Sequence, residues 1–332
     1  MYPGFSASEV LIDGEGSVRG VATRDMGIDK EGNMKDSFER GIELRARQTI
    51  LSEGCRGSCS EFAIDHFKLR EGKDEQTYGL GVKEVWEIPE ENCKPGFIQH
   101  SLGYPLQSSL SSKTFGGSFL YHMEPNLVLV GLVVGLDYEN PHLSPYQEFQ
   151  RLKHHPDISK HLKGGTCISY GARCLNEGGF HAIPKLTFSG GMLAGCSAGF
   201  LNAMKIKGTH TAMKSGMVAA EEIFNSLSSL YSETPTIADS EGMIPEGESN
   251  FEVSSYQQAM EDSWVWEELR SVRNFHGGFS SGMLSGMLHA GFTAHLTKGS
   301  EPWTFSNKIK DSDRTKPASG CLMCVCVHIF IL

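Results

Sequence analysis

The sequence predicts a mixed α/β protein with two domains. With 332 residues, the chain is longer than one typical domain. Short strand patterns dominate its first half, and residues 209–230 have helical periodicity. A hydrophobic content of 39% and a charged content of 21% are typical of a globular chain.

The first predicted elements are β-strands. Residues 8–23 place two β-rich runs around a Gly-containing turn, which predicts a hairpin. A further strand is predicted over 42–51, where apolar residues alternate with polar ones. It ends in a Gly-rich turn at 52–57, and a helix is predicted next at 58–69.

Strand character returns in the middle of the chain, at 78–88 and 115–138. Within the second of these, residues 127–136 are apolar enough to predict a buried central strand. A helix is predicted at 144–153, and the longest helix of the chain follows at 209–230.

The last third of the chain has a different composition. Residues 231–252 are rich in Ser, Glu, Thr and Pro and predict a surface loop or linker, and 256–272 predicts one amphipathic helix. The nearly uncharged stretch 275–296 predicts either a helix on a membrane surface or a buried core helix, because His, Ser and Thr make it too polar for a membrane span. Residues 321–332 are abruptly apolar.

Charge and cysteine content exclude some classes of function. A net charge of −10 argues against a nucleic-acid partner, which needs a basic surface. The nine cysteines do not form a regular disulfide framework and predict free thiols in a reducing compartment. Cys321, Cys324 and Cys326 do not match the four-thiolate pattern of an iron–sulfur cluster, so we predict no metal ligands. Residues 1–12 carry neither a secretory nor a transit pattern.

The segment from Gly195 to Ile223 gives the strongest functional prediction, a dinucleotide-binding loop and helix that holds FAD. An apolar strand runs into glycine, small residues form a turn, and Thr209 or Thr211 is placed to cap a long helix. The N-terminus of such a helix offers free N–H groups and a positive dipole end to a pyrophosphate or a flavin edge. The alternative is a plain β–turn–α unit with small-residue packing.

A second segment points to the same chemistry. The strand Thr49–Ser52 ends in Glu53 and Gly54, a pattern typical of the place where a dinucleotide site closes, although any strand-to-helix turn can have it. By contrast, the glycines at 14–20 have one residue too many for G-x-G-x-x-G and lie within the predicted hairpin. We therefore predict no dinucleotide fingerprint there.

The aromatic segment Phe115–His122 suggests a quinone site. Its paired glycines, Gly116 and Gly117, expose backbone N–H groups beside flat apolar side chains, which suits a quinone carbonyl and ring. A bulge in a strand explains the same pattern equally well.

Long stretches of the chain resemble one family, the electron transfer flavoprotein–ubiquinone oxidoreductases. The resemblance extends from residue 2 to about 318. It is carried by the segments FGGSFLYH, GLVVGLDYENPHLSPYQEFQRLKHHP, YGARCLNEGGFHAIPKLTFSGG, GCSAGF, KIKGTHTAMKSG and SWVWEELRSVRN.

The resemblance implies an oxidoreductase that passes electrons from reduced electron transfer flavoprotein through FAD to ubiquinone. It implies part of a glutathione-reductase-type FAD-binding domain, interleaved with a β-sheet ubiquinone-binding domain. The family also carries a 4Fe–4S cluster and works on the matrix side of the mitochondrial inner membrane, on whose surface it rests. Alternatives are a truncated, non-catalytic product of the same gene family or a related FAD-dependent reductase.

The resemblance also assigns residues and domains. The ubiquinone head group would meet Gly116 and Gly117. The residues implied to bind FAD are Glu53, Gly54, Gly199, Asn202, Gly208, Thr209 and Thr211. The implied domains are FAD binding at 1–75 and 186–230, ubiquinone binding at 76–185, a linker or insertion at 231–255, a membrane-facing helical region at 256–318, and an aberrant tail at 319–332.

The sequence also departs from the family pattern. We find neither the transit peptide nor the G-x-G-x-x-G segment that holds the FAD pyrophosphate in the family. The four cluster cysteines of the family have no counterpart in this sequence. We therefore expect the flavin side of an FAD site here, without its phosphate loop.

Overall fold

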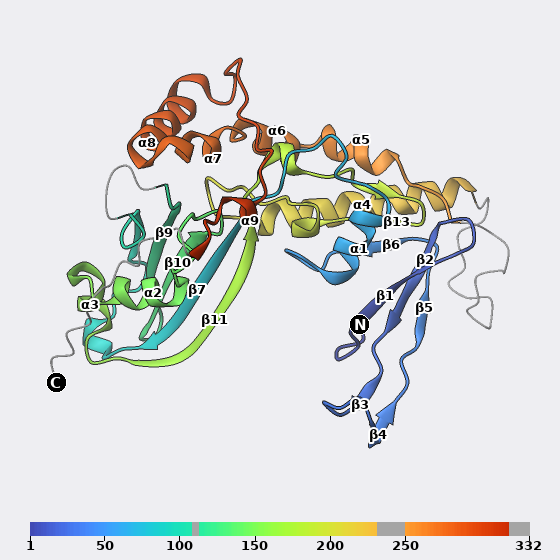
Figure 1. The fold of residues 1–332 in the computed structure, drawn as a ribbon, viewed down its shortest axis with the longest axis horizontal. Helices are drawn as coiled ribbons and strands as arrows, with labels where there is room; N and C mark the ends of the chain where they lie inside the picture. The colour runs from blue at the N-terminus through green and yellow to red at the C-terminus, as the bar shows by residue number, and fades with distance from the viewer. Residues whose placement is uncertain (108–112, 231–249, 319–332) are drawn as a thin grey trace. The chain divides into compact units, whose positions relative to one another are not determined.

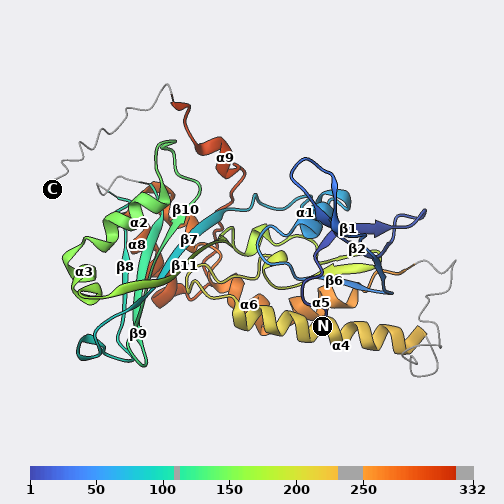
Figure 2. The same ribbon diagram turned by 90° about the horizontal axis from the view of Figure 1, so that it is seen from below.

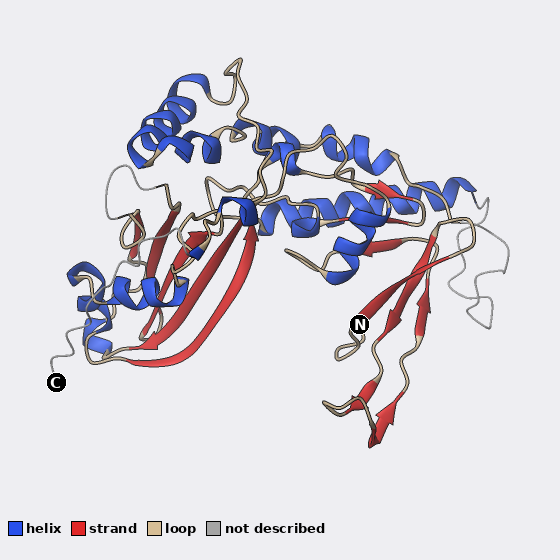
Figure 3. Ribbon diagram, viewed as in Figure 1, coloured by secondary structure: helices blue, strands red, loops and turns tan. Residues whose placement is uncertain are grey.

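The computed structural model describes residues 1–107, 113–230 and 250–318 (Figure 1). The chain forms two compact units. The first combines Met1–Asp74 with Gly179–Arg273, and the second combines Glu75–Gly178 with the chain from Asn274 onward. Helices and strands occur in both (Figure 3). The predicted mixed α/β class, with interleaved segments, is confirmed.

The first unit contains small sheets. An antiparallel sheet joins β1, β2 and β5, a hairpin joins β3 and β4, and a third sheet has the order β12-β13-β6. Among the strands of this unit that the structure describes, only β13 and β6 pair in parallel. The bounds are β1 Ala7–Ile12, β2 Val18–Thr23, β3 Met26–Ile28, β4 Met34–Glu39, β5 Glu43–Arg45, β6 Thr49–Leu51, β12 Thr187–Phe188 and β13 Gly191–Leu193.

The hairpin predicted at 8–23 is confirmed, but the single strand predicted at 42–51 is wrong. Its residues form two strands, β5 and β6, which lie in different sheets. The chain changes its hydrogen-bond partners within three residues. The Ala46 N–H donates to the Arg19 carbonyl at 2.9 Å, and the Thr49 N–H donates to the Gly190 carbonyl at 2.9 Å. Alternation of apolar and polar residues does not reveal such a change of partner.

Among the described residues of the first unit, four segments are α-helical: α1 Ser58–His66, α4 Thr209–Leu230, α5 Ser255–Glu261 and α6 Trp264–Ser271. Helices α1 and α4 confirm the predictions at 58–69 and 209–230. The single helix predicted at 256–272 is wrong, because Ser263 is extended and its hydroxyl donates to the Met260 carbonyl at 2.7 Å, which separates α5 from α6. The linker predicted at 231–252 lies largely outside the described residues.

The second unit is built on an antiparallel sheet of order β11-β7-β10-β9-β8. Its strands are β7 Tyr78–Glu87, β8 Ile98–Leu102, β9 Gly116–Met123, β10 Leu127–Gly135 and β11 Thr166–Asn176. Strand β10 lies in the centre and is buried almost throughout, which confirms the central strand predicted at 127–136. The edge strand β11 is a further strand, in a segment where the sequence predicts none.

Two helices, α2 Pro145–Lys153 and α3 Pro156–Leu162, cover one face of this sheet (Figure 2). Phe149 and Leu152 of α2 pack with alternate residues of β10, such as Val130 and Leu132, in one core cluster. Helix α2 begins where predicted, because the Ser144 side chain accepts the Gln147 N–H and proline occupies the first turn.

The remaining helices of the second unit are α7 Phe275–Gly278, α8 Met283–Phe292 and the short α9 Asp311–Arg314. The stretch predicted at 275–296 is helical but interrupted at Gly282, whose φ of +113° breaks the helix. In the described parts of the chain, no helix has the length and apolar character needed to cross a bilayer.

Candidate functional site

In the first unit, the loops after two parallel strands meet. Strands β6 and β13 pair in parallel up to Leu51 and Leu193, and each is followed by a glycine with positive φ, Gly54 at +83° and Gly195 at +61°. The Ser197 hydroxyl donates to the Gly54 carbonyl at 3.3 Å and joins the two loops. The carboxyl ends of parallel strands are where α/β sheets bind ligands, so this edge is the candidate site.

Glu53 stabilises a helix beside this edge. One of its carboxylate oxygens accepts the Ser60 N–H at 2.6 Å and the Ser60 hydroxyl at 2.7 Å, and the other accepts the Cys59 N–H at 3.3 Å. The carboxylate therefore satisfies free N–H groups at the start of α1. At Gly54, an added Cβ would meet nothing within 4 Å, so the backbone there has open space beside it.

Helix α4 begins at the predicted place, but Thr211 does not cap it. The buried Thr211 hydroxyl donates to the carbonyls of Phe200 and Gly208, the second at 2.9 Å, so it binds acceptors instead of the free N–H groups. The Gly195 N–H donates to the Ser215 hydroxyl at 2.9 Å. These bonds fix the loop 195–208, which includes Gly199 with φ +84°, against the helix.

Asn202 is fully buried, and its side chain is held by the protein. Its carbonyl oxygen accepts the Lys205 N–H at 3.1 Å, and its amide donates to Glu268 Oε1 at 2.8 Å. Glu268 Oε1 also lies 3.0 Å from His210 Nε2 and 3.2 Å from Lys205 Nζ. Glu268, on α6, thus joins the loop to the first turn of α4, a role that the sequence did not reveal.

Burial acts to raise the pKa of Glu268, but hydrogen bonds from His210, Asn202 and Lys205 outweigh it and hold that pKa below its usual value. Replacing Glu268 by glutamine is expected to lower the unfolding free energy of the first unit by about 1–2 kcal/mol near neutral pH. Because the folded-state pKa is lowered, this stabilisation is lost as pH falls through it. Urea unfolding of both proteins should therefore show a smaller difference near pH 4 than near pH 7.

In the second unit, Gly116 and Gly117 lie at the start of β9. Gly116 pairs with Val134 of β10, and Gly117 pairs with Val133 of β10 and Leu102 of β8. The register between β9 and β10 runs without interruption, so the alternative explanation, a bulge, is wrong.

Phe115, just before this pair, lies in an aromatic group. Its ring stacks on His276, with ring centres 5.1 Å apart, and meets the edges of Phe275 and Phe279. These three rings come from α7 and the turn after it, far along the sequence from the glycines. Apart from the clustering of Phe and His at 275–279, no sequence pattern predicts this contact.

The carboxylate of Asp137 lies next to His276, and the backbone carbonyl of Glu177 lies 3.4 Å from His276 Nδ1. Asp137 Oδ2 lies 3.9 Å from His276 Nε2, and Asp137 influences both Glu177 and Asp311 electrostatically. Burial, reinforced by Asp137 and Asp311, raises the pKa of Glu177 to about 7. Burial also raises the pKa of Asp311 to about 6, although the Tyr78 N–H donates to this carboxylate at 2.8 Å. Burial lowers the pKa of His276.

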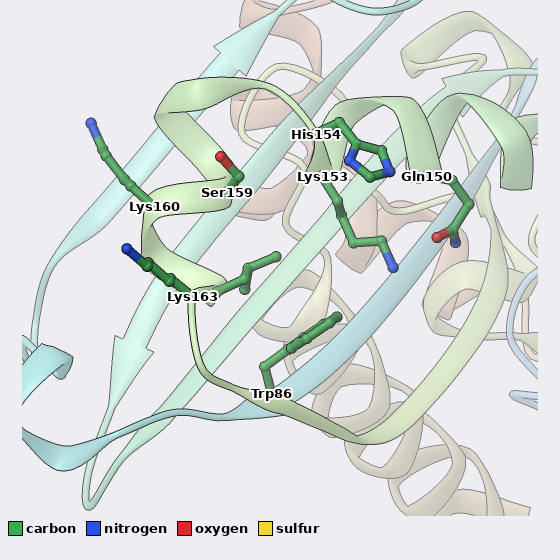
Figure 4. A pocket seen from close by; sticks show the side chains of 8 residues that line it. Trp86, Gln150, Lys153, His154, Ser159, Lys160 and Lys163 are labelled. Atoms are coloured by element: carbon green, nitrogen blue, oxygen red, sulfur yellow. The ribbon is translucent and has the colours of Figure 1, made fainter. Parts of the chain in front are cut away.

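A basic hollow of about 480 Å³ lies elsewhere in the second unit (Figure 4). Lys153 lies above the Trp86 ring and is paired with Glu84 at 2.7 Å, whereas Lys160 and Lys163 extend away from Trp86. The cations therefore do not converge on one point, and none of the residues predicted to bind FAD or ubiquinone lines this hollow. The lining residues are Trp86, Gln150, Lys153, His154, Ser159, Lys160, Leu162 and Lys163.

Comparison with known proteins places these sites in context. Residues 78–175, which lie in the second unit, match a family described as "ETF-QO, ubiquinone-binding". The mitochondrial electron transfer flavoprotein–ubiquinone oxidoreductase of humans is 51% identical over 328 residues, which are 97% of this chain and 50% of the human protein. By sequence, the chain is homologous to about half of an electron transfer flavoprotein–ubiquinone oxidoreductase.

Other relatives agree. The enzyme of the same name from Dictyostelium discoideum is 49% identical and covers 97% of this chain and 52% of its own length. A probable electron transfer flavoprotein–ubiquinone oxidoreductase of Saccharomyces cerevisiae is 48% identical over 96% of this chain and 51% of its own length. The predicted family resemblance is confirmed, and the chain spans about half the length of the curated relatives it matches.

A solved structure shares the fold. A geranylgeranyl bacteriochlorophyll reductase-like protein from Thermoplasma acidophilum aligns with a TM-score of 0.56 over 89% of this chain and 67% of its own, at 15% identity. At this identity the likeness shows the fold alone. Among the described residues, no group of three or more His, Cys, Asp or Glu side chains could hold a metal ion. Cys321, Cys324 and Cys326 lie outside the described residues.

Proposed function

We propose that this chain passes electrons from reduced electron transfer flavoprotein, through FAD, to ubiquinone. The observation that carries the proposal is the 51% identity to the human enzyme over 97% of the chain. The match of residues 78–175 to a ubiquinone-binding family supports quinone binding in the second unit. The FAD-binding role of 1–75 and 186–230, the ubiquinone-binding role of 76–185 and the membrane-facing role of 256–318 belong to this proposal.

In the first unit, FAD would be held at the edge formed by the ends of β6 and β13. The residues present fit its flavin side, because Gly54 leaves open backbone and the loop through Gly199 and Gly208 leads into α4. Glu53, Asn202 and Thr211 would support this loop, since their side chains already bind protein groups. When bound, FAD would supply the carrier for two electrons.

In the second unit, ubiquinone would lie beside Gly116 and Gly117. The ring of Phe115 and the rings of α7 provide a flat apolar neighbourhood for the head group. The 4Fe–4S cluster of the family enters no step that we propose for this chain. The relatives are named mitochondrial, which supports a mitochondrial location, and the matrix side of the inner membrane is part of our proposal.

We also infer that the second unit rests on a membrane surface through α8. Four exposed apolar side chains follow one another at intervals of four residues along α8 and the π-helical segment Thr293–Thr297 after it: Leu284, Leu288, Phe292 and Leu296. Residues at this spacing lie on one side of a helix, and exposed apolar patches of this kind mark interaction surfaces. Insertion of this side into the lipid interface would bring the quinone site close to the membrane.

Replacing Leu284 and Leu288 together by glutamate is expected to weaken binding to phosphatidylcholine vesicles about tenfold or more, because two apolar side chains are lost from the lipid contact. Vesicle co-sedimentation measures the effect. Met34→Glu is the matched control, since Met34 is 71% exposed but lies on β4 of the first unit. Equal sedimentation of all three proteins would contradict this role of α8.

The central experiment is to purify the full chain, add excess FAD, remove unbound FAD by gel filtration and record the flavin absorption. Binding of a short-tailed ubiquinone analogue is then measured by equilibrium dialysis. We expect both to bind, and we expect electron transfer flavoprotein to reduce the bound flavin. Quinone binding without FAD binding would overturn the electron-transfer role and leave quinone binding alone, whereas binding of neither would overturn the whole proposal.

A further inference from the structure

The second unit contains a group of buried carboxylates beside the proposed quinone site. Glu177 is 3% exposed, and the side chain of Asp137 is 16% exposed. Asp311, on α9, accepts the Tyr78 N–H. The three acids come from segments that are far apart in the sequence, so the fold brings them together. Ionising buried acids that crowd one another is costly, and groups perturbed in this way cluster at functional sites.

Two of these acids have an oxygen with an unmet hydrogen bond. Among the described residues, Glu177 Oε2 and Asp137 Oδ1 are buried and have no hydrogen-bond partner. A purely structural acid normally has its oxygens satisfied, because an unpaired buried polar atom costs about 1–3 kcal/mol. These oxygens are therefore placed to receive a proton or to release one.

Gly135 and His276 connect the acid group to Phe115, the residue that precedes Gly116. The Gly135 N–H donates to the Phe115 carbonyl at 2.9 Å. A Cβ at Gly135 would lie 3.0 Å from Asp137 Oδ1 and 3.4 Å from that same carbonyl, so Asp137 and Phe115 border one point. His276 completes the connection, because it stacks on Phe115 and its Nε2 lies 3.9 Å from Asp137 Oδ2.

We propose that Glu177, acting through Asp137 and His276, holds a proton for the quinone oxygen beside Phe115 and the two glycines. This inference rests on the proposed function. Reduction of ubiquinone to ubiquinol takes two electrons, here from reduced flavin, and two protons, one of which passes through Glu177 while the other enters from solvent. For one proton, the carboxyl O–H of Glu177 breaks, the proton moves through the group, and an O–H bond forms at the quinone oxygen. The carboxylate left behind takes a proton from water, and His276, which is 22% exposed, is a route to solvent.

The electrostatics agree with this role. Burial, with Asp137 and Asp311 nearby, raises the pKa of Glu177 to about 7, so this acid both gains and loses its proton near neutral pH. The charged groups that face the cluster are Asp137 at the end of β10, His276 of α7, and Asp311 and Arg314 of α9. Glu177 thus supplies a proton through Asp137 and His276, and it does not itself touch the quinone.

The test is the affinity of the full chain for a short-tailed ubiquinone analogue, measured by equilibrium dialysis from about pH 5.5 to about pH 8.5. The analogue does not titrate in this range, so any pH dependence comes from the protein. A protonated Glu177 leaves the acid group with less negative charge and able to pass a proton toward the quinone oxygen, whereas an ionised Glu177 adds negative charge near that oxygen. We expect the wild-type chain to bind the analogue about threefold more tightly at the acid end of this range. This ratio corresponds to a rise of about half a unit in the pKa of Glu177 when the analogue binds.

Glu177→Gln removes the titration of Glu177, so its affinity should fall much less between the two ends of the pH range than that of wild type, while Asp311 still titrates in both proteins. Glu87→Gln, which makes the same change at an exposed position of β7, should follow the wild-type profile. A flat wild-type profile, or a Glu177→Gln profile like that of wild type, would overturn the proton role alone. Weaker binding by Glu177→Gln at every pH, with a lower melting temperature, would show a structural role instead. Failure of the wild-type chain to bind quinone at any pH would overturn the proposed function and this inference with it.

Discussion

Replacing Gly116 by alanine is expected to destabilise the second unit by about 3 kcal/mol or more. A Cβ at this position would overlap the Val133 carbonyl oxygen of β10 and the Leu106 side chain. The leucine side chain can move, but the carbonyl belongs to the central strand of the sheet and cannot move without disturbing its pairing. The second glycine is restricted in the same way, because a Cβ at Gly117 would overlap the Ser101 carbonyl of β8.

Hydrogen exchange of the β10 amides measures this effect within the second unit. Gly171→Ala is the matched control, since Gly171 lies on β11 of the same sheet and a Cβ there would meet nothing within 4 Å. We expect the control to stay within about 0.5 kcal/mol of wild type. If Gly116→Ala and the control had the same stability, close strand packing would not be the reason for glycine at this position.

Elements with a regular buried pattern could be predicted from the sequence. Strand β10 is apolar throughout and lies in the centre of its sheet, and helix α4 has both periodicity and length. Strand β11 escaped prediction because most of its residues are exposed on both faces, which leaves no alternation to detect. The division of 42–51 into β5 and β6 depends on partners 20 or more residues away, such as Arg19 and Gly190.

The candidate sites show a similar limit. The sequence pointed to Glu53, Asn202 and Thr211, but the hydrogen bonds that occupy their side chains depend on the fold. Glu268 lies 66 residues from Asn202, and the partners come together only when α6 packs beside the loop. The same is true of Asp137, Glu177 and Asp311, since a single carboxylate in a sequence does not reveal its burial or its neighbours.

The acid group also leads to the second large prediction, which concerns stability and needs no bound ligand. Glu177→Gln is expected to stabilise the second unit by up to about 3 kcal/mol near pH 8 and very little near pH 4.5. The reason is the pKa of Glu177, which is about 7 in the folded protein against a usual value of 4.5. Where the pH is low enough for Glu177 to be protonated in both the folded and the unfolded protein, its burial adds no ionisation cost to folding. The free-energy cost of folding grows as pH rises above 4.5. It reaches its full value above about pH 7, where Glu177 is ionised in the folded protein as well.

Hydrogen exchange of the β7 and β10 amides near pH 5 and pH 8 would measure the difference between variant and wild type. Burial also lowers the pKa values of His122, His161 and His276, which weakens the folded state at acid pH, but these residues are the same in both proteins. Their effect therefore cancels in the difference. Glu87→Gln again serves as the control, and its stability difference from wild type should not grow with pH. A stability difference for Glu177→Gln that does not grow between the two pH values would contradict the raised pKa and remove the electrostatic support for a proton held beside the quinone.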